Sequence, residues 1–303
     1  MSEVAATPNP RLKPIKRNSG KKRLRLLMIV DDPAIATFVS KNGVDRLFVD
    51  LERTGKQERQ AHLASWKSEQ TMDDVAKIRE AAPEAHLLVR IDPFSQNTRK
   101  QINEVIARGA DSVMLPMFRL KEELAGFFDL LRGRCQGVPL FETSAALDML
   151  PNCIEALPLT EVHIGLNDLH IDRGDRFMFE PLADGALEEP CAALRESGIS
   201  FGIGGVARAT EGGVSPEFLL GEHVRLGSSA AILSRTFHRG AQTLEQLSRQ
   251  VDFEAEIQAL QSIYDAFLHA LPEDIEQNRR LTHERIRQVA SSLFNNDEQR
   301  GVL

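Results

Sequence analysis

Short apolar runs alternate with helix-like stretches along most of this chain, and that alternation limits its fold more than any other feature. Eight runs of strand character lie at 24–30, 46–52, 86–92, 112–117, 138–143, 161–168, 200–206 and 222–229. The runs are almost continuously apolar, as in parallel strands that are buried on both faces. Eight strands, each followed by a helix, predict an α/β fold, a (β/α)₈ TIM barrel over residues 24–240, near the length of about 250 residues typical of that fold.

The stretches between the runs have helical spacing. PAIATFVSKNG starts with a proline and stops at a glycine, and NTRKQINEVIARGA and KEELAGFFDLLRG show the apolar periodicity of helices. A doubly wound open sheet is the alternative arrangement of the same elements. The glycine-rich segment FGIGGVA lacks the GxGxxG spacing of a dinucleotide-binding turn, so its glycines indicate a sharp turn or a close approach to a ligand.

The last part of the chain follows a different pattern. Beyond residue 240, apolar residues recur at helical spacing up to Leu271, Pro272 interrupts them, and a second helical stretch follows. We therefore expect a helical extension at 241–303, which is longer than one barrel repeat needs. Its apolar stripe must be buried either against the chain's own barrel or in an oligomer contact.

Charge separates the first residues from the rest of the chain. Residues 1–25 hold eight of the 37 basic residues and one of the 44 acidic residues, so the remainder has a net charge of −14 although the whole chain has −7. These cations lie among Pro, Ser and Gly residues and without aromatic side chains. The pattern predicts a disordered basic leader at 1–23 and no nucleic-acid partner.

Targeting signals and cysteines point to the cytoplasm. No apolar stretch approaches the roughly 20 residues that span a bilayer, and the N-terminal residues lack an apolar secretory core. Cys135, Cys153 and Cys191 are too widely spaced to indicate a disulfide framework or a zinc knuckle. These features predict a cytoplasmic protein without a membrane partner.

Two acidic residues carry most of the chemical information. Glu142 and Asp168 each close an apolar run, and the carboxyl ends of barrel strands meet at one mouth, where such proteins build their sites. Two carboxylates and waters suit a hard divalent cation. The pair predicts a site for Mg²⁺, with Mn²⁺ or Co²⁺ as alternatives, whereas two unrelated surface acids are the simpler interpretation.

Other strand ends add groups to the same mouth. The second run ends in Asp50, Glu52 and Arg53, and the third contains Arg90. A cation on two carboxylates has positions left for a substrate that binds through a carboxylate and an adjacent carbonyl, and it stabilises the enolate. Arg90 adds a fork of donors for the carboxylate or the enolate oxygen. Such a site makes or breaks a carbon–carbon bond, and the eight runs contain no lysine for a Schiff base.

Five motifs, in order, resemble one known family. DLE at 50–52, VRID at 89–92, GADSVMLPM at 109–117, ETSAAL at 142–147 and GLNDL at 165–169 are similar to segments of the HpcH/HpaI aldolase and citrate lyase β-subunit family, part of the phosphoenolpyruvate/pyruvate-barrel superfamily. The resemblance covers roughly residues 24–235. It implies a divalent metal on Glu142 and Asp168, binding of the oxo-acid carboxylate or enolate by Arg90, and a role for Asp50 in organising water or a base.

The chain departs from the family at the expected base. Aldolases of the family typically have a histidine where this chain has Arg53, and citrate-lyase-like members have a lysine where it has Met117. Three explanations compete. A metal-bound water positioned by Asp50 or Glu52 acts as the base, His170 takes that role, or the protein binds its ligand without turnover.

The remaining polar residues have more than one interpretation. Arg53 either forms a structural salt bridge or binds a second anionic group of the substrate. Thr143 and Asn167 lie at the ends of the predicted strands beside the metal ligands, so we expect them to contact the substrate and to orient those ligands. An exposed loop is the more ordinary place for His170.

The sequence therefore predicts a divalent-metal-dependent carbon–carbon lyase of the class II aldolase type. Its substrate is a small 2-oxo acid or the corresponding aldol adduct, with Arg90, Asp50 and Glu52 as catalytic residues. The alternatives are a citrate-lyase-like acyl-CoA lyase and a barrel that binds a ligand without catalysis. The resemblance also implies a homo-oligomer, a trimer or a hexamer.

Overall fold

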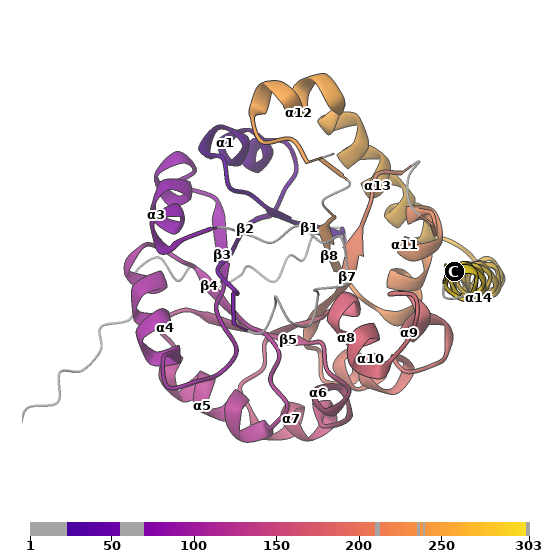
Figure 1. The fold of residues 1–303 in the computed structure, drawn as a ribbon, viewed down its shortest axis with the longest axis horizontal. Helices are drawn as coiled ribbons and strands as arrows, with labels where there is room; N and C mark the ends of the chain where they lie inside the picture. Colours follow the sequence, from indigo (N-terminus) through magenta and orange to yellow (C-terminus); the bar gives the residue numbers. More distant parts are fainter. Residues whose placement is uncertain (1–22, 55–69, 210–212, 235–236, 239, 301–303) are drawn as a thin grey trace, which may run out of the picture.

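Eight parallel strands close into one barrel in the order β1 to β8, with helices outside it (Figure 1). The computed structural model describes residues 23–54, 70–209, 213–234, 237–238 and 240–300, the last seven of these for the backbone alone. The predicted TIM barrel is confirmed. The predicted disordered leader lies, apart from Arg23, outside the described residues.

Seven of the predicted runs correspond to strands. One of these strands, β7, has the predicted bounds, and the others are shorter than their runs or shifted by two residues. The strands are β1 Arg25–Ile29, β2 Arg46–Asp50, β3 His86–Arg90, β4 Ser112–Leu115, β5 Gln136–Phe141, β6 Glu161–Ile164, β7 Ser200–Val206 and β8 Ala230–Leu233. Most inner and outer positions of these strands are buried, as expected for parallel strands covered by helices.

The prediction of the eighth strand at 222–229 was wrong. Residues up to Leu226 belong to helix α11, Pro216–Leu226, which starts with a proline and ends at Gly227 in the left-handed conformation, with φ 86°. Glu222 and His223 are buried on this helix, so the segment lacks the polar face that marks a surface helix. The true strand β8 is the short apolar run that follows.

Helices cover the barrel on all sides (Figure 1). They are α1 Pro33–Lys41, α3 Met72–Ala81, α4 Thr98–Ala107, α5 Lys121–Leu131, α6 Ser144–Asp148, α7 Leu150–Ala156, α8 Leu166–Arg173, α9 Glu180–Ala183, α10 Glu188–Glu196, α11, α12 Leu244–Gln250, α13 Phe253–Leu268 and α14 Pro272–Arg300. The three helices expected at PAIATFVSKNG, NTRKQINEVIARGA and KEELAGFFDLLRG are α1, α4 and α5. Local signals set their ends: the Asp32 carboxylate accepts the Ile35 amide at the start of α1.

The inside of the barrel is layered, because alternate strand residues point the same way. Its middle is an apolar cluster of Leu27, Phe48, Leu88, Met114, Val138, Leu140 and Ala230. On β2, Arg46 lies two residues before Phe48 and Asp50 lies two residues after it. The barrel interior therefore has a charged layer at each end and an apolar layer between them.

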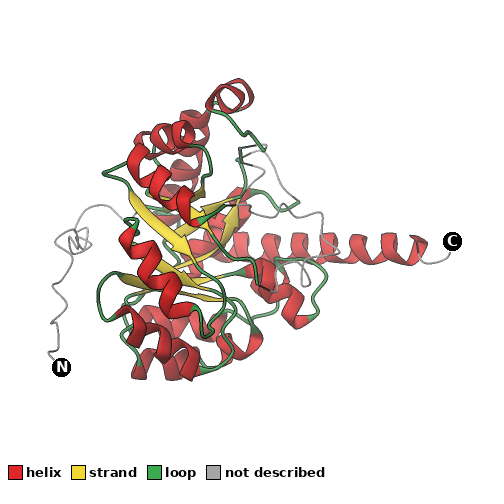
Figure 2. Ribbon diagram, turned by 60° about the vertical axis from the view of Figure 1, so that its left-hand side comes forward, coloured by secondary structure: helices red, strands yellow, loops and turns green. Residues whose placement is uncertain are grey.

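The last three helices pack on the chain's own barrel. Helices α13 and α14 lie against α11, α14 also contacts α9, and α12 contacts α1. Figure 2 shows α14 extending well past the barrel toward the C-terminus. The predicted helical extension is therefore present, while its part in an oligomer stays a prediction. Among the described residues, no helix combines the length and apolarity needed to cross a membrane.

Candidate active site at the barrel mouth

Asp50 and Arg90 form the centre of the mouth. They end the neighbouring strands β2 and β3, where they stand opposite each other in the register. Arg90 donates from Nε to Asp50 Oδ1 at 2.9 Å and from Nη2 to Asp50 Oδ2 at 2.8 Å. This bidentate pair fixes the plane of the guanidinium. The side chain of Asp50 is fully buried, so its charge is held inside the barrel.

Glu52 joins this pair from the turn after β2. Its Oε2 lies 3.5 Å from Arg90 Nη2, and its side chain is 1% exposed. Burial alone lowers the pKa of the Arg90 guanidinium, but the carboxylates of Asp50 and Glu52 raise it well above its usual value. Arg90 is thus a permanent cation beside two acids.

Glu142 directly follows β5 and is buried. Its Oε1 accepts the backbone amide of Met117 at 3.1 Å. Burial raises the pKa of the Glu142 carboxyl well above its usual range, the charges of Asp168 and Glu52 raise it further, and Arg90 opposes them. All three charged groups therefore lie close enough to Glu142 to act on its ionisation.

Asp168 does not close a strand as we predicted. Strand β6 ends at Ile164, and Asp168 lies in the first turn of helix α8, where it is buried. Gly165 is the N-cap of this helix, and a methyl group placed on that residue would meet Glu142 Oε2 at 2.8 Å. The start of α8 therefore lies next to Glu142, and the two predicted ligands are on adjoining elements.

The mouth brings several buried acids together. Asp50, Glu52, Glu142 and Asp168 are all buried, and Arg90 is a cation that interacts with Asp50, Glu52 and Glu142. Carboxylate oxygens are the donors that Mg²⁺ prefers, and this ion commonly takes one or two carboxylates, substrate oxygens and waters. Glu142 and Asp168 supply carboxylate donors of that kind. Within the part of the chain that the structure describes, no group of three or more His, Cys, Asp or Glu side chains could hold a metal.

The predicted substrate-binding residues have different surroundings. Thr143 is fully buried, its hydroxyl donates to Phe118 O at 3.0 Å, and it accepts the Ala146 amide at 3.1 Å as the N-cap of α6. It is therefore fixed beside Glu142 by the fold. Asn167 is half-buried next to Asp168 in the first turn of α8.

Arg53 lies at the exposed rim of the mouth. Its amide donates to Asp92 Oδ1 at 2.8 Å, and its guanidinium donates to the backbone oxygen of Gln70 at 3.1 Å. Burial raises the pKa of the Asp92 carboxyl, but hydrogen bonds from Thr54, Arg53 and Gln101 hold it below its usual value. The hydrogen bond from the backbone amide of Arg53 to Asp92 thus holds this residue at the rim.

Two positions differ from what the sequence suggested. His170 is buried in helix α8 rather than exposed in a loop, and its Nδ1 has no hydrogen-bond partner among the described residues. Gln70 was not predicted at all. It accepts the Asp50 amide at 2.8 Å and donates to Val30 O at 2.6 Å, so it joins the ends of β1 and β2.

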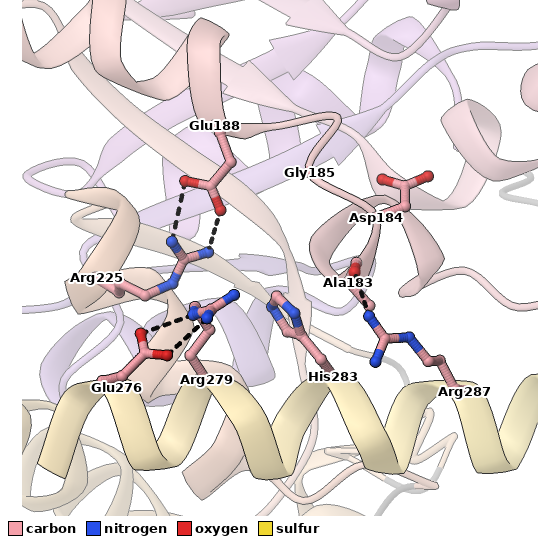
Figure 3. A pocket seen from close by; sticks show the side chains of 9 residues that line it. All are labelled: Ala183, Asp184, Gly185, Glu188, Arg225, Glu276, Arg279, His283 and Arg287. Atoms are coloured by element: carbon pink, nitrogen blue, oxygen red, sulfur yellow. Dashed lines mark hydrogen bonds and ion pairs between the residues drawn. The ribbon is translucent and has the colours of Figure 1, made fainter. Parts of the chain in front are cut away.

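A separate cleft of about 570 Å³ lies between α9, α10, α11 and α14 (Figure 3). In it Arg225 pairs with Glu188, Arg279 pairs with Glu276, and Arg287 donates to the backbone oxygen of Ala183. None of the mouth carboxylates lines this cleft. The mouth holds the buried carboxylates and the residues of the sequence motifs, so it is the stronger candidate for a site.

Comparisons with known proteins support the fold. No family model and no curated protein sequence matches the chain. A HpcH/HpaI aldolase/citrate lyase family protein from Burkholderia cenocepacia J2315 is similar in structure, with a TM-score of 0.58, 15% identity, and coverage of 77% of this chain and 94% of the other. A HpcH/HpaI aldolase from Desulfitobacterium hafniense DCB-2 gives a TM-score of 0.54, 16% identity, and coverage of 77% and 95%.

The citrate synthase SbnG is a further neighbour, with a TM-score of 0.52, 13% identity, and coverage of 70% of this chain and 86% of the other. At such low identity these likenesses establish the fold. The chain thus shares its fold with proteins of the HpcH/HpaI aldolase and citrate lyase family, the family that its sequence motifs resemble.

Proposed function

We propose that this protein is a divalent-metal-dependent carbon–carbon lyase that acts on a small 2-oxo acid or its aldol adduct through an enolate. One observation carries the proposal: Asp50, Glu52, Glu142 and Asp168 are all buried at the mouth of the barrel, and Asp168 and Glu52 add to the effect of burial in raising the pKa of Glu142. A buried acid whose pKa is raised by other acids in such a position is typical of a functional site.

Glu142 and Asp168 are the residues that would hold the metal. They come from adjoining elements, and each raises the energy of the other's negative charge, as the raised pKa of Glu142 indicates. Bound there, Mg²⁺, Mn²⁺ or Co²⁺ would polarise the substrate carbonyl and offset the charge of the enolate. Thr143 holds the chain after Glu142 in place, so this ligand is positioned before any substrate arrives.

Arg90 binds the anionic end of the substrate. Asp50 uses both of its oxygens to hold the guanidinium in one plane, at 2.9 and 2.8 Å. A guanidinium fixed in this way meets a carboxylate or an enolate oxygen without having to reorganise. Asp50 is therefore assigned to orient Arg90, and the rim residue Arg53 to contact a second anionic group.

Glu52 is the acid/base group that the proposal assigns. Its carboxylate lies 3.5 Å from Arg90 Nη2, beside the place proposed for the substrate. In the cleaving direction Glu52, acting through a water, takes the proton from the adduct's hydroxyl group. The carbon–carbon bond then breaks, the hydroxyl carbon leaves as a carbonyl compound, and the remaining enolate takes up a proton.

The structural neighbours favour this class of reaction. One is a HpcH/HpaI aldolase and another is a citrate synthase, and both names describe carbon–carbon bond chemistry on small acids. The ordered motifs at 50–52, 89–92 and 165–169, which resemble those of the HpcH/HpaI aldolase and citrate lyase family, support the same class of reaction.

Solvent deuterium exchange into pyruvate and related 2-oxo acids tests the proposal. We expect exchange with Mg²⁺, Mn²⁺ or Co²⁺, none after chelator treatment, and none in Glu142→Gln, which keeps the shape of the side chain. Glu155→Gln, a change at an exposed position of α7, is the matched control and should exchange like the parent protein. Exchange that persists without metal contradicts the proposed chemistry. Metal binding without exchange of any 2-oxo acid supports a non-catalytic barrel instead.

A further inference from the structure

Met117 has an unusual backbone conformation. Its φ is 56°, in the left-handed region, and Arg132 is the other non-glycine residue with a positive φ in the part of the chain that the structure describes. Side chains with a Cβ rarely adopt this conformation, and such residues cluster at functional sites when the surroundings fix them. Met117 lies in the connection between β4 and α5, at the mouth.

The neighbours of Met117 hold it in place from the end of β5. Phe118 is buried and meets Phe141 edge to face, with 5.0 Å between ring centroids. The hydroxyl of Thr143 donates to Phe118 O at 3.0 Å. Between these two contacts, the amide of Met117 donates to Glu142 Oε1 at 3.1 Å. Three consecutive residues, 141 to 143, therefore fasten this connection and direct one amide at Glu142.

Gly165 bounds Glu142 on the other side. Its φ of −93° and ψ of 103° are extended values that any residue adopts, so the backbone does not require a glycine here. Space does require one, because a Cβ would come within 2.8 Å of Glu142 Oε2 and 2.9 Å of Glu142 Cβ. The two positions are complementary. Residue 117 has a side chain although its positive φ favours glycine, and residue 165 has none although its backbone conformation suits any residue.

We propose that Met117 and Gly165 are positioning residues that set the orientation of the Glu142 carboxylate. The Met117 amide holds Oε1, and Gly165 leaves room for Oε2 against the first turn of α8, which carries Asp168. Oε2 thereby faces the second ligand before any cation binds. This inference rests on the proposed function in one respect: the orientation of the Glu142 carboxylate would serve to bind the proposed metal.

Manganese binding and amide exchange test the inference together. We expect Gly165→Ala to bind Mn²⁺ at least tenfold more weakly than the parent protein, measured by electron paramagnetic resonance. Gly213→Ala is the matched control, since a Cβ there meets nothing closer than 3.9 Å, and it should bind as the parent does. In the metal-free protein, hydrogen exchange of the Met117 amide should be slow, and it should become faster in Glu142→Ala and in Gly165→Ala.

A second pair of variants addresses the strained residue. Met117→Gly keeps the left-handed conformation accessible and should retain Mn²⁺ binding within about threefold, whereas Met117→Val disfavours that conformation and should lose tenfold or more. This pair still gives an answer if Gly165→Ala does not fold.

The outcomes separate the two hypotheses. If the parent protein binds no Mn²⁺ but the amide exchange follows the expected pattern, the proposed metal site fails and the positioning role stands. If Gly165→Ala and Met117→Val bind Mn²⁺ as tightly as the parent protein and the Met117 amide stays protected, the positioning role is overturned. Lower thermal stability with unchanged Mn²⁺ affinity also overturns it, because that is the result of a purely structural role.

Discussion

The two ends of the barrel interior both carry buried charged groups, which shift the pKa of a buried acid in opposite directions. At the amino ends of the strands, Glu161 accepts Arg46 Nη1 at 2.8 Å and Arg46 Nη2 at 2.7 Å, and Arg25 Nη1 at 3.2 Å. Gln136 adds a further hydrogen bond at 3.1 Å. Burial raises the pKa of the Glu161 carboxyl, but the two guanidinium groups lower it to about 2. Here one acid is surrounded by cations.

At the carboxyl ends of the strands the balance is reversed. Arg90 is surrounded by Asp50 and Glu52, and burial with further negative neighbours raises the pKa of Glu142. The apolar layer that contains Phe48 and Leu88 separates this cluster from Glu161. The two clusters are therefore independent, although β2 contributes Arg46 to one and Asp50 to the other.

The difference shows how to tell a structural charge cluster from a functional one. The Glu161 cluster satisfies its own charges with groups of the chain, which is expected of an end of the barrel that supports the fold. At the mouth, other acids add to burial in raising the pKa of Glu142, which is expected where a cation or a cationic transition state binds. Burial alone does not distinguish them, because both clusters are buried.

The largest effect should come from breaking the cluster at the amino ends of the strands. Arg46→Met removes the bidentate partner of a buried carboxylate, and such losses cost about 3–5 kcal/mol of unfolding free energy. Urea unfolding measures the change, and Arg249→Met, at an exposed pair with Glu245, should change stability by less than about 0.5 kcal/mol. Affinity for Mn²⁺ should stay the same in both variants. A loss of Mn²⁺ binding without a loss of stability in Arg46→Met would reverse the roles given to the two ends.

The two ends should also respond to pH in opposite directions. Glu161 has a folded pKa of about 2 against an ordinary 4.5, so it stabilises the fold above pH 4.5, by about 3 kcal/mol, and this contribution is lost as the pH falls toward 2. Glu142 has a raised folded pKa, so its contribution is present at low pH and is lost as the pH rises through that pKa.

Unfolding of chelator-treated protein across the pH range measures both effects. We expect the loss of stability at higher pH to disappear in Glu142→Gln and to be reversed by Mg²⁺. Mg²⁺ should not change the loss of stability at low pH, which comes from Glu161. If the stability of the parent protein instead rises steadily with pH and does not differ from that of Glu142→Gln, the raised pKa of Glu142 is contradicted.

A somewhat smaller effect is expected from removing one charge at the mouth. Asp168→Asn should weaken Mn²⁺ binding at least about a hundredfold, because Asp168 is a proposed ligand and loss of even an outer-shell partner weakens metal binding by about 10- to 100-fold. The same change should reduce the loss of stability of the chelator-treated protein at higher pH, because a like charge next to Glu142 is gone. Calorimetric Mn²⁺ titration and urea unfolding give the two values. Equal losses of affinity and of stability would instead indicate that Asp168 supports the fold.

The periodic part of the fold could be predicted from the sequence, and its exceptions have a physical reason. Seven strands followed from apolar runs because parallel strands buried on both faces leave a strong signal. The eighth was misplaced because α11 buries Glu222 and His223, and a helix that is buried on its polar positions loses the pattern of a surface helix. The glycine at 227 and the proline at 216 were the available signals for that helix.

The site was predicted in part for a similar reason. Residues that end strands meet at one edge, so Asp50, Arg90 and Glu142 could be grouped from their positions in the chain. Gln70 could not be grouped with them. Its side chain contacts Val30 O, 40 residues away in the sequence, and no sequence pattern predicts that contact. The role of the Met117 amide depends on a positive φ that the residue type argues against.

The smallest effect should come from the rim, which differs from both charged ends in being exposed. Arg53 is fixed through its backbone by Asp92, so Arg53→Gln should change the free energy of unfolding by less than about 0.5 kcal/mol. An exposed charge pair contributes about 1 kcal/mol at most, so KM should rise about fivefold for a substrate with a second carboxylate and not for pyruvate, with kcat unchanged. Steady-state kinetics with both substrates measures this split. An equal change for the two substrates would mean that Arg53 acts on the carboxylate that Arg90 is proposed to bind, and the rim would then belong to the mouth cluster.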